Sequence, residues 1–133
     1  MLKPEAITMG LIGEVLIRIE KKGLKIAALK LIRASKKEIE ALYEMHKGKS
    51  FYEKLINGIA SMPVVIMVVE GLDAIKVMRQ LAGATNPSEA TKGTIRGDYG
   101  LNVTQNVIHT ADGSEYALRE IGIFFKRDDV LEY

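Results

Sequence analysis

The sequence contains no cysteine, no tryptophan and only two histidines. Without cysteine, the chain forms neither disulfides nor thiolate metal sites, and no thiol can act as a nucleophile. A net charge of +2 over 133 residues is too small for a protein that holds nucleic acid as a polycation. The longest aliphatic run covers residues 64–69, far short of a membrane span, and the first residues lack the apolar core of a signal peptide. We therefore expect a cytoplasmic protein with no membrane partner and no specific nucleic-acid partner.

Length and composition favour one globular domain over residues 1–133. Hydrophobic residues make up 47% of the chain and charged residues 27%, which is ordinary for a globular protein. A chain of this length can bury one core but is short for two domains. We find no internal repeat and no linker composition, so nothing divides the chain.

Apolar periodicity predicts helices alternating with strands. Residues 12–19 follow a helical period, and Gly23 should end that helix. Ser35 and Glu38 form a capping box that predicts a helix after them. The predicted strands are residues 24–32, with a bulge, residues 63–70, and a strand edge at residues 106–109; the other predicted helices are residues 51–59, 72–82 and 114–125. This order favours an α+β fold, a ferredoxin-like βαββαβ sandwich with an antiparallel four-stranded sheet and additional helices.

Residues 83–100 fit neither period and are rich in glycine, threonine and serine. Connections longer than about 12–15 residues are uncommon unless they are functional or disordered. The apolar centre around Ile95, between Gly93 and Gly97, favours an ordered loop over a disordered one. We expect this loop to serve the function.

His109 follows that loop at the end of an apolar stretch. Taken alone, a histidine in such a place is more often a satisfied polar residue than a catalyst. A largely neutral imidazole can nevertheless attack phosphorus directly if cations neutralise the phosphate oxygens. Glu120 is a candidate to accept from the second ring nitrogen and fix the tautomer. Candidate cations and hydroxyls nearby are Arg79, Arg96, Thr85 and Thr94.

Two other patterns, a Gly-Lys-Ser triplet and a second histidine, do not predict a functional site. The triplet Gly-Lys-Ser at residues 48–50 is not a P-loop, because position 43 is tyrosine where that motif needs glycine. His46 lies beside Lys47 at a helix end, where we expect it to be solvated. No spacing typical of a protein-only metal site occurs.

Five segments of the chain resemble nucleoside diphosphate kinases, in the order found in that family: KPEAITMGLIGEVLIRIEKKGLK, HKGKSFYEKL, PVVIMVVEG, LAGATNPSEATKGTIRGDYG and NVIHTADGSEYALREIGIFF. Together they cover essentially the whole chain, and GTIRGD combined with N-x-x-H-x-x-D is highly specific. The resemblance implies a ferredoxin-like fold assembled from dimers into a hexamer or tetramer. It also implies a ping-pong reaction, in which a nucleoside triphosphate phosphorylates the histidine and a diphosphate receives the group. Mg²⁺ would arrive on the nucleotide phosphates.

The resemblance also implies a role for each matching residue. His109 matches the phosphorylated histidine and Glu120 the carboxylate that orients it. The residues that match ribose-binding positions are Lys3 and Asn106. Those that match phosphate-contacting positions are Tyr43, Arg79, Thr85 and Arg96. Those that match the slot for the base are Phe51, on which the base stacks, with Leu55 and Val103.

The chain departs from the family pattern at a few positions. Glu5 stands where the family usually has aspartate, Met9 where it has arginine, and Ala111 where it has serine. Family members also carry several residues more before the lysine, so we expect a shortened first strand. Departures at Glu5 and Met9 put local capping or subunit contacts in question, but not the chemistry.

An alternative hypothesis is that the chain has the same fold but no catalytic activity. The chain would then be a catalytically weak or inactive ferredoxin-like module that binds nucleotide or nucleic acid. Loss of activity would normally appear at the histidine, an arginine or the asparagine, and all these positions are filled. The sequence therefore favours the enzyme.

Overall fold

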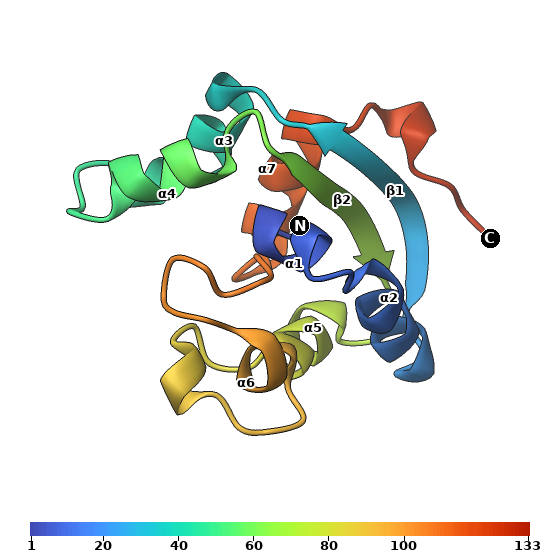
Figure 1. The fold of residues 1–133 in the computed structure, drawn as a ribbon. Coiled ribbons are helices and arrows are strands. Elements are labelled where there is room, and N and C mark those ends of the chain that lie inside the picture. The colour runs from blue at the N-terminus through green and yellow to red at the C-terminus, as the bar shows by residue number, and fades with distance from the viewer.

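The computed structural model describes residues 1–133 and shows an α+β fold (Figure 1). Its two strands are β1 (Lys25–Arg33) and β2 (Pro63–Glu70). The helices are α1 (Pro4–Thr8), α2 (Ile12–Lys21), α3 (Lys36–Leu42), α4 (Tyr52–Ile59), α5 (Ala74–Ala82), α6 (Ile95–Tyr99) and α7 (Ser114–Phe124). Short 3₁₀ turns are η1 (Glu44–His46), η2 (Pro87–Glu89) and η3 (Arg127–Asp129). No helix is long and apolar enough to cross a membrane.

The two strands pair antiparallel along their whole length, from Lys25 opposite Glu70 to Arg33 opposite Pro63. The register shifts between Ile26 and Ala28, which confirms the bulge predicted in the first strand. Both strands are rich in aliphatic residues, which pack well on a pleated surface; β2 is mostly buried, whereas several residues of β1 are exposed.

The expected four-stranded sheet is not confirmed, because the structure has a sheet of two paired strands. Beyond β2, Leu2 makes one isolated antiparallel bridge to Val65 and another to Ile108, where two further strands were expected. On one side, α1 begins at Pro4, only two residues after Leu2. On the other, Val107 has a φ of +75°, which no strand residue adopts. The predicted strand edge at residues 106–109 is therefore a single bridge.

Each face of the sheet carries its own hydrophobic core. Because side chains alternate along a strand, Val64, Ile66 and Val68 of β2 pack into one cluster with apolar residues of α3 and α4. Val65 points to the other face and packs with residues of α1, α2 and α6. Figure 1 shows α3 and α4 at one end of the molecule and α5 and α6 at the other, with α1 between them.

Local signals set the ends of several helices. Ser35 Oγ accepts from the Glu38 amide at 3.1 Å, and Glu38 Oε2 accepts from the Ser35 amide at 2.8 Å, which confirms the capping box. Gly23 follows α2 with a φ of +79°, so the chain reverses there at little steric cost. The helix predictions are confirmed to within one or two residues at each end.

The long connection between α5 and residue 100 is ordered, as predicted, and contains η2 and α6. The Thr94 hydroxyl caps α6 by accepting from the Gly97 amide at 3.0 Å. A side chain at position 83 would overlap Thr94, because a Cβ there would lie 2.4 Å from the threonine oxygen. The loop therefore packs tightly against the end of α5 and brings α6 beside the segment that carries His109.

Candidate active site

The structure places all eleven predicted site residues on the wall of one pocket of about 260 Å³. They come from the N-terminal segment, from α3 to α4, from α5, from the long loop, from residues 103–109 and from α7. They are Lys3, Tyr43, Phe51, Leu55, Arg79, Thr85, Arg96, Val103, Asn106, His109 and Glu120. Residues separated by up to 117 positions in the chain thus share one cavity.

His109 is held by a carboxylate from the neighbouring helix. Its Nε2 lies 2.7 Å from Oε1 of Glu120, which is itself 8% exposed on the last turns of α7. A carboxylate only accepts hydrogen bonds, so Nε2 carries the proton and Nδ1 of the neutral ring keeps its lone pair. The Tyr43 ring meets the imidazole edge-on, with ring centres 5.2 Å apart. The arrangement fixes both the tautomer and the plane of the ring.

Burial keeps this imidazole neutral. Desolvation lowers the pKa of His109 below its ordinary value and outweighs the hydrogen bond that His109 donates to Glu120, which raises the pKa. The side chain still has 20% of its surface exposed, so a ligand in the pocket can reach it. A neutral, fixed and accessible imidazole is the form that acts as a nucleophile.

Arg96 is a buried cation beside the histidine. Its side chain is 8% exposed, and its two terminal nitrogens donate to backbone carbonyls, Nη1 to Gly83 at 2.9 Å and Nη2 to Ile108 at 2.7 Å. A further donor, Nε, is buried and has no partner in the chain. No carboxylate neutralises this guanidinium by a direct contact. An anion in the pocket would supply the missing counter-charge.

Arg79 brings a second cation to the same pocket from the last turn of α5. It forms an ion pair with Asp112, and both side chains are about half exposed. Asp112 is the aspartate of the N-x-x-H-x-x-D motif and lies on the turn between His109 and α7. The pair joins the two sides of the pocket near the histidine.

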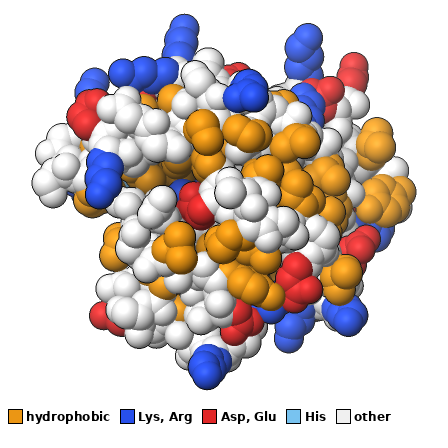
Figure 2. Space-filling view, in the orientation of Figure 1, with side chains coloured by type: hydrophobic (Ala, Val, Ile, Leu, Met, Phe, Trp, Pro, Cys, Tyr) orange, Lys and Arg blue, Asp and Glu red, His pale blue; other side chains and the backbone are white.

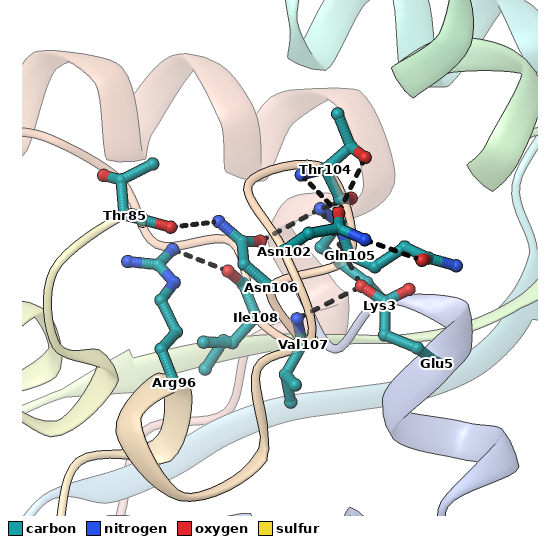
Figure 3. Close-up of polar contacts among 10 residues, drawn as sticks. All are labelled: Lys3, Glu5, Thr85, Arg96, Asn102, Thr104, Gln105, Asn106, Val107 and Ile108. Carbon is teal, nitrogen blue, oxygen red and sulfur yellow. Dashed lines mark hydrogen bonds and ion pairs between the residues drawn. The ribbon is translucent and has the colours of Figure 1, made fainter. Parts of the chain in front are cut away.

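The segment before His109 is strained. Val107 has a φ of +75°, and the Ile108 amide donates to the Asn106 carbonyl at 2.9 Å, so Val107 is the centre of a γ-turn of the rare, positive-φ kind. Such a backbone is costly for a fully buried, β-branched residue. The turn directs the Asn106 side chain and the Ile108 carbonyl toward polar partners in the pocket (Figure 3).

A polar network fixes Lys3 and Asn106 around this turn (Figure 3). Lys3 Nζ donates to the Thr104 carbonyl at 2.6 Å and to Asn106 Oδ1 at 3.0 Å. Asn106 Nδ2 in turn donates to the Thr85 carbonyl at 3.0 Å. Lys3 is only 3% exposed, and burial lowers its pKa to about 8, against the attraction of Glu5. The network presents an amide and an ammonium to the pocket in defined positions.

Aromatic rings form a further part of the pocket wall, next to His109. His46 packs against Phe51, with ring centres 5.4 Å apart, and stacks on Tyr43 at 6.1 Å. His46, which we expected to be solvated, is partly exposed, and its ring also forms part of the pocket wall. Its position three residues after Tyr43, on the same helical face, was the signal for this.

Other residues of the pocket wall were not singled out by sequence reasoning: Met45, Thr104 and Tyr116. Thr94, by contrast, was a candidate but does not line the pocket, because its hydroxyl is used to cap α6 and to donate to the Thr91 carbonyl at 2.6 Å. No three histidine, aspartate or glutamate side chains gather as metal ligands.

Comparison with known families gives a match over almost the whole chain. Residues 1–130 match the family described as nucleoside diphosphate kinase. The chain is 52% identical over 130 residues to a nucleoside diphosphate kinase of Saccharolobus solfataricus, covering 98% of this chain and 94% of that protein. It is also 52% identical over 136 residues to one from Pyrococcus furiosus, covering 100% of this chain and 84% of that protein.

Solved structures of the same family are also similar to this chain. A nucleoside diphosphate kinase from Halobacterium salinarum, in complex with CDP, superposes with a TM-score of 0.95 at 40% identity, covering 99% of this chain and 88% of that one. A nucleoside diphosphate kinase family protein from Babesia bovis has a TM-score of 0.94 at 39% identity and covers 99% of this chain and 89% of that one.

Proposed function

The chain belongs to the nucleoside diphosphate kinase family, and on that premise we propose that His109 carries the phosphoryl group between two nucleotides. The reaction of this family of phosphotransferases moves the γ-phosphate of a nucleoside triphosphate to a nucleoside diphosphate. The observation that carries the assignment is the 2.7 Å contact between His109 Nε2 and Glu120 in a pocket with two arginines. A non-enzymatic module is not favoured, since the relatives matched over the whole chain are kinases.

The chemistry proceeds in two balanced halves. In the first, the lone pair of His109 Nδ1 forms a bond to the γ-phosphorus while the bond from phosphorus to the β,γ-bridging oxygen breaks, and the diphosphate leaves. In the second, a terminal oxygen of another diphosphate attacks the phosphohistidine and Nδ1 leaves. Glu120 keeps the proton on Nε2 in both halves, so no separate base is needed to free the nucleophile.

The cations of the pocket stabilise the charge that develops on the transferring group. Arg96 is placed for this before any ligand arrives, because two backbone carbonyls hold its guanidinium in the pocket wall. Arg79, Tyr43 and Thr85 complete the phosphate-contacting set in this proposal. Preplaced donors matter most in phosphoryl transfer, where positioning and electrostatics supply almost all of the catalysis.

Mg²⁺ enters, in this proposal, as part of the nucleotide substrate, bound to its phosphates. The carboxylates of the pocket do not form a metal site, because Glu120 is engaged by His109 and Asp112 by Arg79. When bound, the ion would neutralise phosphate oxygens that the arginines do not reach.

The rest of the nucleotide is held by groups that all nucleotides can use. We assign Lys3 and Asn106 to the ribose hydroxyls and the Phe51 ring to the base, with Leu55 and Val103 completing the slot. The CDP complex of the Halobacterium salinarum protein supports a nucleotide ligand. An aromatic face accepts every base, since each base has a π-face to stack.

We also propose a homo-oligomer, a hexamer or tetramer built from dimers. The outer edge of β1 pairs with no other strand, and Leu29 and Leu31 on that strand are 48% and 63% exposed. Figure 2 shows hydrophobic side chains gathered on the side of the molecule where β1 and β2 lie. Exposed apolar strand edges of this kind are typical of subunit contacts. The ferredoxin-like strand order is part of the proposal too, supported by the bridge order β1, β2, Leu2, Ile108.

One experiment tests the central assignment. The protein is mixed with γ-labelled ATP and a different nucleoside diphosphate, and label is followed in the protein and in the new triphosphate. We expect an acid-labile, base-stable label on the native protein and none on His109→Ala, which should also lose turnover. Label that survives in the variant would refute the assignment of His109. The cytoplasmic location stays a prediction from the sequence.

A further inference from the structure

Glu5 is placed to act on the site from the helix below it, although it does not line the pocket. It is the second residue of α1, and its carboxylate turns back toward residues 104–107 (Figure 3). Its Oε1 accepts from the Val107 amide at 3.1 Å and lies 3.8 Å from Lys3 Nζ. The side chain is only 11% exposed. One carboxylate oxygen thus contacts both the strained turn and the buried lysine.

The contact with Val107 supports a backbone that is unfavourable by itself. The γ-turn uses the Asn106 carbonyl and the Ile108 amide, and it leaves the Val107 amide to find another acceptor. Glu5 is that acceptor, while the Val107 carbonyl accepts from the Lys3 amide at 2.9 Å. Strained residues persist where their surroundings determine both backbone groups. Without Glu5, the buried amide of Val107 would lose its hydrogen-bond acceptor, and only the hydrogen bond from the Lys3 amide to the Val107 carbonyl would hold the turn.

The contact with Lys3 places the negative charge of the Glu5 carboxylate beside the buried ammonium. Lys3 is surrounded by the Thr104 carbonyl and the Asn106 amide oxygen, which are neutral acceptors. The charged groups that act on it are Glu5 from α1, Arg96 from α6 and His109 from the segment after the turn. Arg96 repels the ammonium, so Glu5 is the one counter-ion in contact with it. A buried ammonium without a counter-ion tends to lose its proton.

We propose that Glu5 is a positioning residue for phosphoryl transfer, which holds the turn before His109 and supplies the counter-charge of Lys3. The inference rests on the proposed function, since it concerns the same site. It also gives a structural role to glutamate at position 5, where the family usually has aspartate. The longer side chain of Glu5 is used inside the protein, at the edge of the site, and not in capping α1, whose N-terminus has no side-chain cap.

Two substitutions separate the two contacts. Glu5→Gln keeps an oxygen that can accept from the Val107 amide but removes the charge beside Lys3. Glu5→Ala removes both. The matched control is Glu14→Gln, a half-exposed glutamate on α2 that pairs with Arg18 at 2.9 Å, away from the pocket. Thermal unfolding, nucleotide binding, KM and kcat are measured for each protein between pH 6 and pH 9.

In Glu5→Gln we expect a native unfolding temperature and a changed pH profile. The native Lys3 has a pKa of about 8, raised by Glu5 from the still lower value that burial would give. If the substitution lowers that pKa by about one unit, the protonated fraction at pH 8 falls from roughly a half to roughly a tenth. Nucleotide KM should then rise about fivefold at pH 8 and return to the native value near pH 6. In Glu5→Ala we expect, in addition, a kcat about tenfold lower at every pH, as expected for a lost hydrogen bond to a charged group.

An unchanged pH profile in Glu5→Gln, or a shift of equal size in Glu14→Gln, would overturn the proposal. So would a Glu5→Gln protein whose losses follow its unfolding temperature at every pH, because that pattern is the signature of a merely structural role. Failure of the proposed function is seen separately: the native protein would then transfer no phosphoryl group, while nucleotide binding would still report the effect of Glu5.

Discussion

Arg96→Lys is the substitution that tests the pocket most directly, because it keeps the charge and changes only the geometry of the donors. The arginine fork reaches two carbonyls at once, those of Gly83 and Ile108, at 2.9 and 2.7 Å. A lysine ammonium has a shorter reach and a tetrahedral arrangement, so it can satisfy one of these carbonyls but not both. It also lacks the Nε donor that the arginine leaves free.

The expected magnitudes follow from these contacts. Hydrogen bonds to charged groups contribute about 1.5–3 kcal/mol each, so losing one should lower the free energy of unfolding by about 2 kcal/mol. Losing a preplaced donor to the transferring group should cost about 10²-fold in kcat, or roughly 2.7 kcal/mol. KM should change by no more than about threefold, because the charge that attracts the ground-state nucleotide is retained.

The assay combines urea unfolding with steady-state and single-turnover kinetics. Single turnover reports phosphorylation of His109 alone and so excludes an effect on product release. Arg33→Lys is the matched control, since Arg33 also donates to a carbonyl, that of Ser61 at 3.0 Å, but lies outside the pocket. If Arg96→Lys keeps kcat and KM and loses only stability, Arg96 is structural and the reasoning is refuted. A raised KM at unchanged kcat would show that Arg96 binds substrate and transition state equally.

Four further predictions concern the same pocket. Glu120→Gln should slow phosphorylation of His109 by about ten- to a hundredfold, because an amide can present either a donor or an acceptor to Nε2 and no longer fixes the tautomer; an unchanged single-turnover rate would contradict this. Because burial lowers the pKa of His109, its phosphorylation rate should decline with falling pH only at a pH below that at which an ordinary histidine becomes protonated. Because the pKa of Lys3 is about 8, nucleotide KM should rise above pH 8 as that charge is lost. Adenine, guanine and pyrimidine nucleotides should show comparable kcat/KM; a preference above about a thousandfold, roughly 4 kcal/mol, would reveal a polar base-reading group. Ala111→Ser should change the rate by about tenfold at most, since one hydrogen bond is involved, and a gain above about a hundredfold would show that the native chain is catalytically impaired.

Local features of the fold could be predicted because they are encoded between near neighbours in the chain. The capping box needs only Ser35 and Glu38, three residues apart, and the helices and strands follow from periods of 3.6 and 2. The ordered loop before residue 100 was likewise predictable from its length and composition. His109, Glu120 and the two arginines were recognised by their types and positions, the ribose- and base-binding candidates by the resemblance to a family, and the structure brings them into one pocket.

What the sequence could not determine is how residues far apart in the chain meet. Lys3 and Asn106 lie 103 positions apart, and Glu5 and Val107 lie 102 apart, so no local pattern predicts either contact. The positive φ of Val107 is opposed by the local preference of a β-branched residue and is held only by partners that the tertiary fold supplies. The same fold reduces two expected strands to single bridges, turns the Thr94 hydroxyl from the pocket to a helix cap, and seats His46 between two aromatic rings. The sequence by itself determined which residues are able to do the chemistry, because that depends on side-chain type; the tertiary structure decided which of them are held in place, because that depends on packing between distant segments.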